Sequence, residues 1–153
     1  MTASFDRDPV ILLHDVARMM RIKFDQRARA RGMTRAQWII LARLDRQPGL
    51  SQNELATICE VEPITVARLI DRLERRGVLE RRADPSDRRI WRLHNLPAAK
   101  PILEEITAFR ETLIQDIDAQ IGGDSREALV HALLGIKTYL AAPTEPDALA
   151  ARK

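Results

Sequence analysis

The first third of the chain carries apolar residues at helical spacing. Five of them follow one another at steps of three and four, which places them on one face of a long helix: Val10, Leu13, Ala17, Met20 and Phe24. We expect Gly32 to end this helix. Thr34 and Gln37, three positions apart, predict a capping box at the start of a second helix, which Pro48-Gly49 closes.

Two further helices follow. Ser51 and Glu54 match a second capping box, with the hydroxyl placed to accept from a free backbone N–H and the carboxylate placed to reach back. The short helix that starts there is interrupted from Cys59 to Glu62. Pro63, whose fixed φ and missing N–H suit a first helical position, opens a fourth helix that runs to Arg76. Two helices joined by a tight turn are a candidate helix-turn-helix.

The fourth helix is amphipathic. One side carries four apolar residues that can pack on a core: Val66, Leu69, Ile70 and Leu73. The other side carries polar and basic residues: Thr65, Arg68, Arg72 and Arg75. A helix of this kind is often no more than a solvated surface, so its basic side alone does not establish a binding function.

A β-hairpin is predicted next, with strands at Val78–Ala83 and Arg89–His94. The segment between them, residues 84–88, has Pro85 where a type I turn favours it, and its tip is charged. Eight arginines lie from Arg72 to Arg92, which is more than the five carboxylates nearby can pair. We therefore expect part of this surface to bind an external anion, and a phosphate backbone is the obvious candidate.

The C-terminal third contains two more apolar stripes at helical spacing. The first lies on a helix that Gly122-Gly123 ends: Ile102, Ile106, Phe109, Leu113, Ile117 and Ile121. The second lies on a helix that follows from Asp124: Leu129, Leu133, Ile136 and Leu140. With the first helix of the chain, they carry more apolar surface than the small helix-turn-helix part can cover, which favours burial by a partner chain. The alternative is a monomer in which the three segments pack on one another.

The composition fits one domain of ordinary size, or a compact core with a small appendage. The chain has 153 residues, of which 45% are hydrophobic and 31% charged, so it can bury a core and keep a charged surface. The net charge is only +3. However, nine Lys or Arg stand against three Asp from His14 to Gln47, whereas six stand against nine acidic residues from Asn95 to Lys153. The basic charge therefore lies before the C-terminal helices.

Several classes of protein do not fit this sequence. The apolar runs are far shorter than the ~20 residues of a membrane span and the N-terminus lacks a secretory pattern, so we expect a cytoplasmic protein that does not bind membranes. Cys59 is the only cysteine and the three histidines are far apart, which leaves no pattern for a metal. Without a Gly-rich phosphate loop or a Gly-x-Ser-x-Gly turn, we expect neither a cofactor nor an enzyme. The neighbours His14-Asp15 keep a hydrolase open as an alternative.

The order of these elements resembles the MarR family of bacterial winged helix-turn-helix regulators. The hairpin sequence Asp84-Pro85-Ser86-Asp87-Arg88-Arg89 carries most of the resemblance, and residues 73–79, Leu-Glu-Arg-Arg-Gly-Val-Leu, precede it at the family's distance. The resemblance covers almost the whole chain. One departure is residues 95–99, Asn-Leu-Pro-Ala-Ala, where a Leu-Thr pair usually caps the next helix. The start of that helix is therefore open by a few residues.

The resemblance implies a mainly α-helical fold with a small β-hairpin wing. It places the winged helix-turn-helix DNA-binding domain at residues 32–95, a helical dimerisation region at residues 1–31 and 96–142, and a tail at residues 143–153. The implied function is that of a transcriptional regulator, in the first instance a repressor. It would bind a pseudo-palindromic operator in double-stranded DNA as a homodimer, with recognition helices in successive major grooves and wings along the minor groove. A winged helix that binds protein partners is the alternative.

The resemblance also assigns roles to residues of the third and fourth helices. Four residues fall in the groove-facing part of the recognition helix, where Arg can donate bidentately to guanine: Pro63, Ile64, Thr65 and Arg68. Arg72 and Arg75 are expected at phosphates. Ser51 and Gln52 could contact a phosphate at the start of the third helix, although Ser51 is explained by its role as a cap.

At the tip of the hairpin, the family pattern has an Asp that braces an Arg in the minor groove. This pattern points to Asp87 and Arg89, with Arg88 beside them. A narrow minor groove attracts guanidinium groups, so the resemblance implies readout of groove shape at this point.

Many members of the family release DNA when a small, often phenolic or otherwise anionic compound binds between the winged domain and the dimer helices. The resemblance nominates a pocket at the first two helices and their junction, with these candidates: His14, Arg18, Met33 and Trp38. Met33 and Trp38 are also typical core residues. Cys59 lies in the helix-turn-helix, not on the first helix as in the peroxide-sensing branch, and resembles a small buried hydrophobe more than a redox sensor.

Overall fold

The computed structural model describes residues 5–59, 61–122 and 124–142. The predicted tail at residues 143–153, the N-terminal residues 1–4 and Gly123 of the predicted helix end lie outside the described residues. The chain divides into two compact units, Met1–Thr107 and Ala108–Lys153, and each is described by itself. In the part of the chain that the structure describes, no helix has the length and hydropathy needed to cross a lipid bilayer.

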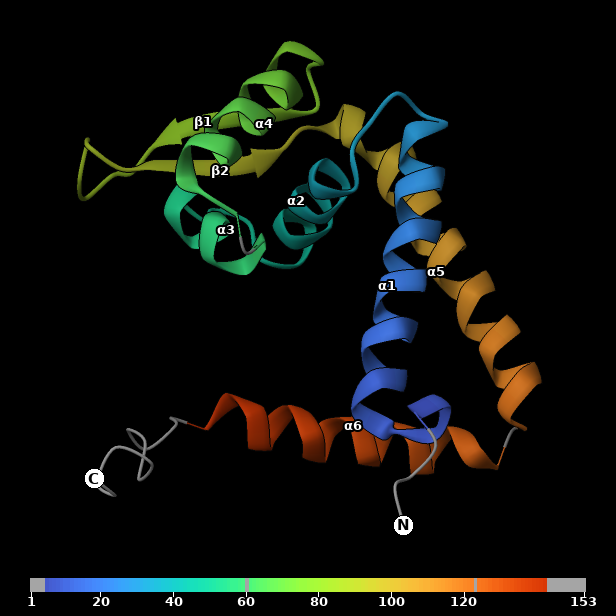
Figure 1. Cartoon of the computed structure of the whole chain (residues 1–153). Helices are drawn as coiled ribbons and strands as arrows, with labels where there is room; N and C mark the ends of the chain where they lie inside the picture. The colour runs from blue at the N-terminus through green and yellow to red at the C-terminus, as the bar shows by residue number, and fades with distance from the viewer. Residues whose placement is uncertain (1–4, 60, 123, 143–153) are drawn as a thin grey trace, which may run out of the picture. The chain divides into compact units, whose positions relative to one another are not determined.

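The first unit begins with a 3₁₀ turn, Phe5–Arg7, and the long helix α1, Pro9–Arg29 (Figure 1). Asp8 caps α1: its Oδ1 accepts hydrogen bonds from the backbone N–H groups of Val10 and Ile11, at 2.8 and 3.3 Å. The helix ends before Gly32, as predicted, and Gly32 has a φ of 63°. This left-handed conformation costs glycine little, because it has no Cβ to clash with the backbone.

Both predicted capping boxes are confirmed. Helix α2, Arg35–Arg46, begins with reciprocal hydrogen bonds between Thr34 and Gln37. Helix α3, Gln52–Cys59, begins with the N–H of Ser51 donating to Glu54 at 2.6 Å and the N–H of Glu54 donating to the Ser51 hydroxyl at 3.3 Å. Each box satisfies backbone N–H groups that a helix start leaves free, which is why four-residue patterns located these helices.

Helix α4, Pro63–Arg75, opens with proline at its first position, as predicted. Its four apolar residues are buried with side chains of α2, α3 and the hairpin, and together they form the core of this part of the chain. The largest fully buried side chains all belong to it: Ile40, Leu41, Leu44, Leu55, Val66, Ile70, Leu73, Leu79 and Leu93. These elements therefore bury their apolar faces within one chain.

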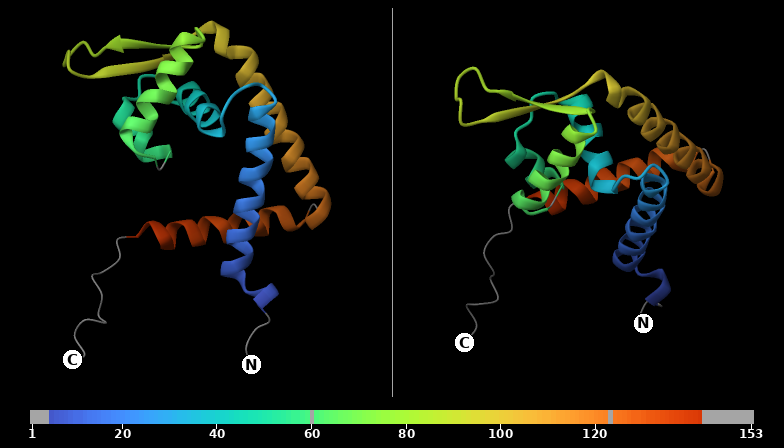
Figure 2. Two further views of the ribbon diagram at one scale, coloured as in Figure 1. Left: turned by 45° about the horizontal axis from the view of Figure 1, so that its top comes forward. Right: turned by 90° about the horizontal axis from the view of Figure 1, so that it is seen from above.

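The hairpin consists of β1, Leu79–Ala83, and β2, Trp91–Asn95, which pair antiparallel and extend beyond α3 and α4 in all three ribbon views (Figures 1 and 2). The predicted second strand, Arg89–His94, starts two residues too early. The N–H of Ile90 donates to the carbonyl of Asp87, which keeps residues 89 and 90 in the connecting turn. Residues 49–51 add an edge to the hairpin, because Ser51 forms a β-bridge with Arg92.

The chain then enters helix α5, Lys100–Ile121, through a 3₁₀ turn at Pro97–Ala99. The start that the sequence left open is thus at Lys100, and Pro101 lies in the first turn, where its missing N–H leaves no bond unmade. Glu105 ties this start to the end of α1, because its carboxylate lies 3.0 Å from Arg27 and 2.6 Å from Arg31.

The second unit contains the rest of α5 and helix α6, Ser125–Ala141. Gly122, with a φ of 78°, ends α5 as predicted, and Asp124 is the N-cap residue of α6. No described residue of α6 is buried, although its apolar stripe contains leucine and isoleucine. An apolar stripe that remains exposed in one chain is what the expected partner chain would cover.

Candidate nucleic-acid interface

The exposed side of α4 is polar and basic, as its sequence predicts. Thr65, Arg68, Arg72 and Arg75 are all exposed, opposite the buried apolar face. Ile64, in the first turn, is 63% exposed, so a large aliphatic side chain lies on the same outer face as Thr65 and Arg68. The N-terminal half of α4 therefore presents an aliphatic group, a hydroxyl and a guanidinium side by side to the outside.

The start of α3 lies next to the start of α4. The side-chain amide of Gln52 donates to the carbonyl of Pro63 at 3.3 Å, so Gln52 connects the two helices. The Ser51 hydroxyl accepts from the N–H of Glu54. The Glu54 carboxylate in turn accepts from the backbone N–H of Ser51, and this hydrogen bond is the main cause that lowers the pKa of the Glu54 carboxyl. Ser51 is thus occupied as a helix cap, the simpler of the two roles that the sequence left open.

Only part of the arginine cluster at residues 72–92 is neutralised within the chain. Arg81 pairs with Asp71, at 2.7 Å, and with Glu74. Arg82 pairs with Glu80 and Arg92 with Asp84. The others form no ion pair with the residues that the structure describes: Arg72, Arg75, Arg76, Arg88 and Arg89. The expectation that local carboxylates cannot pair all eight arginines is confirmed.

Asp84 organises the turn that joins the two strands of the wing, a role that the sequence did not reveal. Its Oδ1 accepts from the N–H and hydroxyl of Ser86, at 2.7 and 2.5 Å, and its Oδ2 accepts from Nε of Arg92 at 2.7 Å. These hydrogen bonds hold the pKa of the Asp84 carboxyl well below its usual range, with those from Ser86 contributing most. Arg92 also reaches Glu54 at 3.3 Å, which links the wing to α3.

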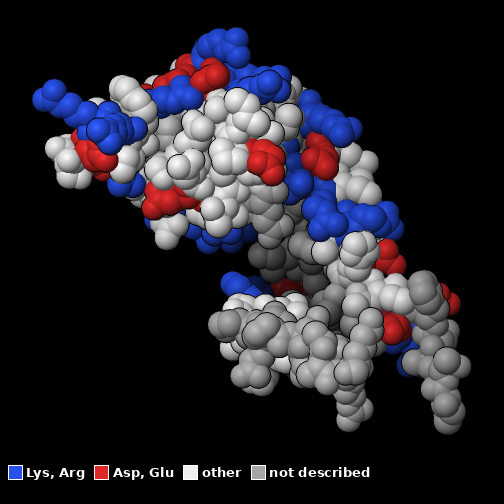
Figure 3. Space-filling view, turned by 60° about the vertical axis from the view of Figure 1, so that its left-hand side comes forward, with Lys and Arg blue, Asp and Glu red and all other residues white. Residues whose placement is uncertain are grey.

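The predicted brace between Asp87 and Arg89 takes a different form. The Asp87 carboxylate accepts a hydrogen bond from the backbone N–H of Arg89, at 2.9 Å, and not from its guanidinium. The brace therefore fixes the main chain at the tip, and the Arg88 and Arg89 side chains extend from it exposed and unpaired among the described residues. Figure 3 shows Lys and Arg side chains spread over the upper part of the molecule, with acidic side chains between them.

An apolar hollow of about 430 Å³ lies between the side chains of α1, α2 and the start of α5 in the first unit. Most of its lining is apolar, with two arginines: Ala17, Met20, Arg21, Phe24, Arg35, Trp38, Ile39, Ala42 and Ile106. Nε1 of Trp38, a buried donor in this lining, has no hydrogen-bond partner among the described residues, whereas Nε of Arg35 lies 3.5 Å from the carboxylate of Asp25. A buried donor without a partner is rare and costs free energy, so Nε1 of Trp38 indicates a missing acceptor.

The four ligand-binding candidates do not come together in one hollow. Trp38 lines the apolar hollow, whereas Met33 lines a different one beside α4. His14 and Arg18 lie on the exposed side of α1, and the guanidinium of Arg18 is 3.5 Å from Asp15. Arg21 and Arg35, which the sequence did not single out, are the basic residues of the apolar hollow.

Cys59 lies half-buried at the end of α3. Burial raises the pKa of its thiol, and the nearby charges of Arg43 and Arg35 offset only part of this increase. A thiol with a raised pKa is a poor nucleophile at neutral pH, which fits the interpretation of Cys59 as a small hydrophobe. Within the described ranges, no group of three His, Cys, Asp or Glu side chains is placed to hold a metal ion.

The comparisons with known proteins agree with this geometry. Residues 31–90 match the model of a family described as the MarR family. The crystal structure of MarR is 28% identical, with a TM-score of 0.76 over 92% of this chain and 95% of that chain. BpsR of Bordetella bronchiseptica is 25% identical, with a TM-score of 0.73 over 90% of this chain and 98% of that chain. Staphylococcus aureus MepR in complex with DNA is 24% identical, with a TM-score of 0.73 over 87% and 98%.

Proposed function

The chain belongs to the MarR family of winged helix-turn-helix transcriptional regulators, and from this premise we propose that it binds a pseudo-palindromic operator as a homodimer and represses transcription there. The observation that carries the proposal is the set of exposed arginines on α4 and the wing tip that no described carboxylate pairs. Unpaired guanidinium groups on a protruding helix and hairpin fit a nucleic-acid backbone.

Residues of α4 divide into two roles in this proposal. Pro63, Ile64, Thr65 and Arg68 lie at or near the exposed N-terminal half of α4, the part that enters the major groove in helix-turn-helix proteins. Arg68 reads a guanine, and Ile64 offers an apolar contact for a thymine methyl group. Arg72 and Arg75, nearer the C-terminus, contact phosphates and fix the register of the helix.

The wing adds a second, shape-dependent contact. Arg89 enters the minor groove with Arg88 beside it, while Asp87 holds the backbone of the tip. Gln52, hydrogen-bonded to the start of α4, reaches a phosphate next to the groove. Replacing Arg89 with Ala is expected to weaken operators with A/T-rich flanks most, because A/T-rich sequences narrow the minor groove. Equal losses on G/C-rich flanks would contradict entry of Arg89 into the minor groove.

A small anionic aromatic compound in the apolar hollow is the proposed signal that releases DNA. The apolar lining suits an aromatic ring, Nε1 of Trp38 offers a donor without an acceptor, and the guanidinium groups of Arg21 and Arg35 supply positive charge. In BpsR, DNA binding is regulated by 6-hydroxynicotinic acid, a compound of this class. We place the site at Arg35 and Trp38, with Arg21 at its rim, and not at His14, Arg18 or Met33.

Selection of bound genomic fragments by the purified protein, followed by salt titration, tests the proposal. Operator affinity should fall steeply and linearly with the logarithm of salt concentration, since each phosphate contact releases counterions. A protein-binding winged helix would select no fragment and show no such slope. A hydrolase would show activity that survives Arg68→Ala and is lost in His14→Ala.

A further inference from the structure

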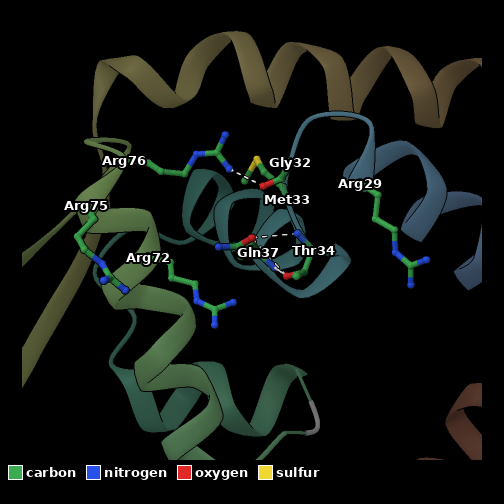
Figure 4. A pocket seen from close by; sticks show the side chains of 8 residues that line it. All are labelled: Arg29, Gly32, Met33, Thr34, Gln37, Arg72, Arg75 and Arg76. Carbon is green, nitrogen blue, oxygen red and sulfur yellow. Dashed lines mark hydrogen bonds between the residues drawn. The ribbon is translucent and has the colours of Figure 1, made fainter.

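A second hollow, of about 410 Å³, lies beside the C-terminal half of α4 (Figure 4). It is lined by the end of α1, the turn into α2, the first turn of α2 and the end of α4: Arg29, Gly32, Met33, Thr34, Gln37, Arg72, Arg75 and Arg76. Four of the eight lining residues are arginines and none is acidic. Since no described carboxylate lines this hollow, its positive charge is available to an anionic ligand.

None of the arginines of this hollow is paired with a described carboxylate, although two of them donate to backbone carbonyls. Arg76 is held in place by hydrogen bonds from its guanidinium to the carbonyls of Gly32, at 2.9 Å, and Arg31, at 3.3 Å, which leave its charge uncompensated. Arg75 donates from Nε to the carbonyl of Asp71. Arg29 and Arg72 form no ion pair with any residue that the structure describes, so several N–H donors at this site have no acceptor.

Gln37 adds a donor from the floor of the hollow. Its side chain is almost fully buried, with 4% exposed, and its Oε1 accepts from the backbone N–H of Thr34 at 2.9 Å. This bond fixes the orientation of the amide, so its NH₂ group lies on the opposite side, facing α4, as Figure 4 shows. The NH₂ group has no acceptor among the described residues. An amide donor without an acceptor, on a side chain that is almost fully buried and lines the same hollow as Arg72 and Arg75, indicates a ligand rich in acceptor oxygens.

We propose that this hollow binds a small compound that carries phosphate groups, and that the bound compound competes with DNA for Arg72 and Arg75. Guanidinium groups pair with phosphate oxygens through two parallel hydrogen bonds, and the volume exceeds that of a single phosphate. The binding step stands on the hollow alone, whereas the competition rests on the proposed function. This site is separate from the apolar hollow and takes a different class of ligand.

Calorimetric titration of the full-length protein with pyrophosphate, at constant ionic strength set with chloride, tests the binding step. We expect the unaltered protein to bind pyrophosphate and Gln37→Glu to bind it at least about tenfold more weakly, because a carboxylate oxygen replaces the amide donor. Glutamate retains the acceptor for Thr34, so the capping box of α2 survives. Gln115→Glu, the same change of charge at an exposed position on α5, should stay within about twofold.

A second variant protects the result against a folding defect. Arg29→Ala removes an exposed guanidinium from the hollow and should weaken pyrophosphate binding about three- to tenfold. Arg46→Ala, at the far end of α2, removes the same charge outside the hollow and serves as its control. Absence of pyrophosphate binding by the unaltered protein, or losses as large in the two controls, would overturn the proposal.

The same preparations separate this inference from the proposed function. Pyrophosphate should displace operator DNA from the unaltered protein, and at least about tenfold more of it should be needed for Gln37→Glu. If the protein binds pyrophosphate but no DNA, the ligand site in the hollow is supported and the proposed function as a DNA-binding regulator is rejected. If Gln37→Glu weakens DNA binding while no variant binds pyrophosphate, the hollow takes only a backbone phosphate, and the inference is wrong.

Discussion

The winged part of the chain and the helices that flank it handle their apolar residues in opposite ways. In α2, α3, α4 and the hairpin, most of the large aliphatic side chains are buried against one another within the chain, and Ile64 is the exposed exception. In α1 and α6, by contrast, many large hydrophobic side chains are exposed, by 37 to 79% of their surface. Helix α6 has no buried residue among those described. The first set folds on its own interactions, whereas the second requires apolar surface from elsewhere. The exposed apolar faces of α1 and α6 are the surface on which the proposed dimer would pack.

Substituting one buried and one exposed isoleucine of α4 should give the largest effect on stability. Ile70→Ala leaves a cavity in the core and is expected to lower the free energy of unfolding by about 2–5 kcal/mol. Ile64→Ala, on the same helix but exposed, should change it by less than ~0.5 kcal/mol. Denaturant unfolding at one fixed protein concentration measures both. Equal losses would mean that the two faces of α4 are not as different as the structure indicates.

A charge in the stripe of α6 tests the other side of the comparison. Leu133→Asp should weaken the dimer by a factor on the order of 100, because the carboxylate would be buried in the interface without a partner. His131→Asp places the same charge on α6 outside the stripe and should have little effect. Sedimentation equilibrium over a range of concentrations measures the dissociation constant. If the unaltered protein is monomeric, the proposed dimer is wrong.

Asp84 predicts a pH dependence for the wing. Because its pKa is lower in the folded protein than in the unfolded chain, the stabilisation is fully present above the unfolded value of ~4 and is lost as the pH falls through the folded value. Asp84→Asn should therefore lower the melting temperature at neutral pH, and the difference from the unaltered protein should shrink as the pH falls below ~4. Melting curves at several pH values measure this difference. A difference that stays constant as the solution is acidified well below the unfolded value would contradict the assignment.

The smallest expected effect separates two roles of Ser51. As a cap, Ser51→Ala should cost about 1 kcal/mol of unfolding free energy, and Ser51→Asp should restore most of it. As a phosphate contact, Ser51→Asp should instead weaken DNA binding strongly, since it adds a negative charge near the backbone. Unfolding and DNA titrations on the two variants decide between these roles. A loss of affinity in both variants with unchanged stability would reject the cap.

The parts of the fold that the sequence predicted are those set by neighbouring residues. Spacings of three or four residues locate the capping boxes at Thr34 and Ser51 and the buried face of α4. Proline at position 63 marks the start of α4. The second strand was misplaced because turn hydrogen bonds at the tip hold residues 89 and 90. Turn chemistry of this kind competes with strand propensity and is hard to weigh from one sequence.

The contacts that the sequence missed join distant residues. Arg92 reaches Glu54, 38 positions away, and Arg76 reaches Gly32, 44 positions away. No local pattern distinguishes these arginines from Arg88 or Arg89, which stay unpaired in the described structure. Only the tertiary fold shows which guanidinium groups are neutralised and which can reach a ligand. The two hollows likewise combine residues from several helices, so the sequence could nominate Trp38 but not Arg35 in the apolar hollow, and Met33 but not Gln37 in the other.

The most direct test of the account is the ratio of operator to random-duplex affinity, measured by competition binding for the unaltered protein, Arg68→Ala and Arg75→Ala. Loss of a bidentate base contact should cost Arg68→Ala roughly 1–3 kcal/mol on the operator and lower the ratio. Loss of a phosphate contact should weaken Arg75→Ala about equally on both duplexes and leave the ratio unchanged. An unchanged ratio in Arg68→Ala, or no preference for any sequence in the unaltered protein, would contradict the account.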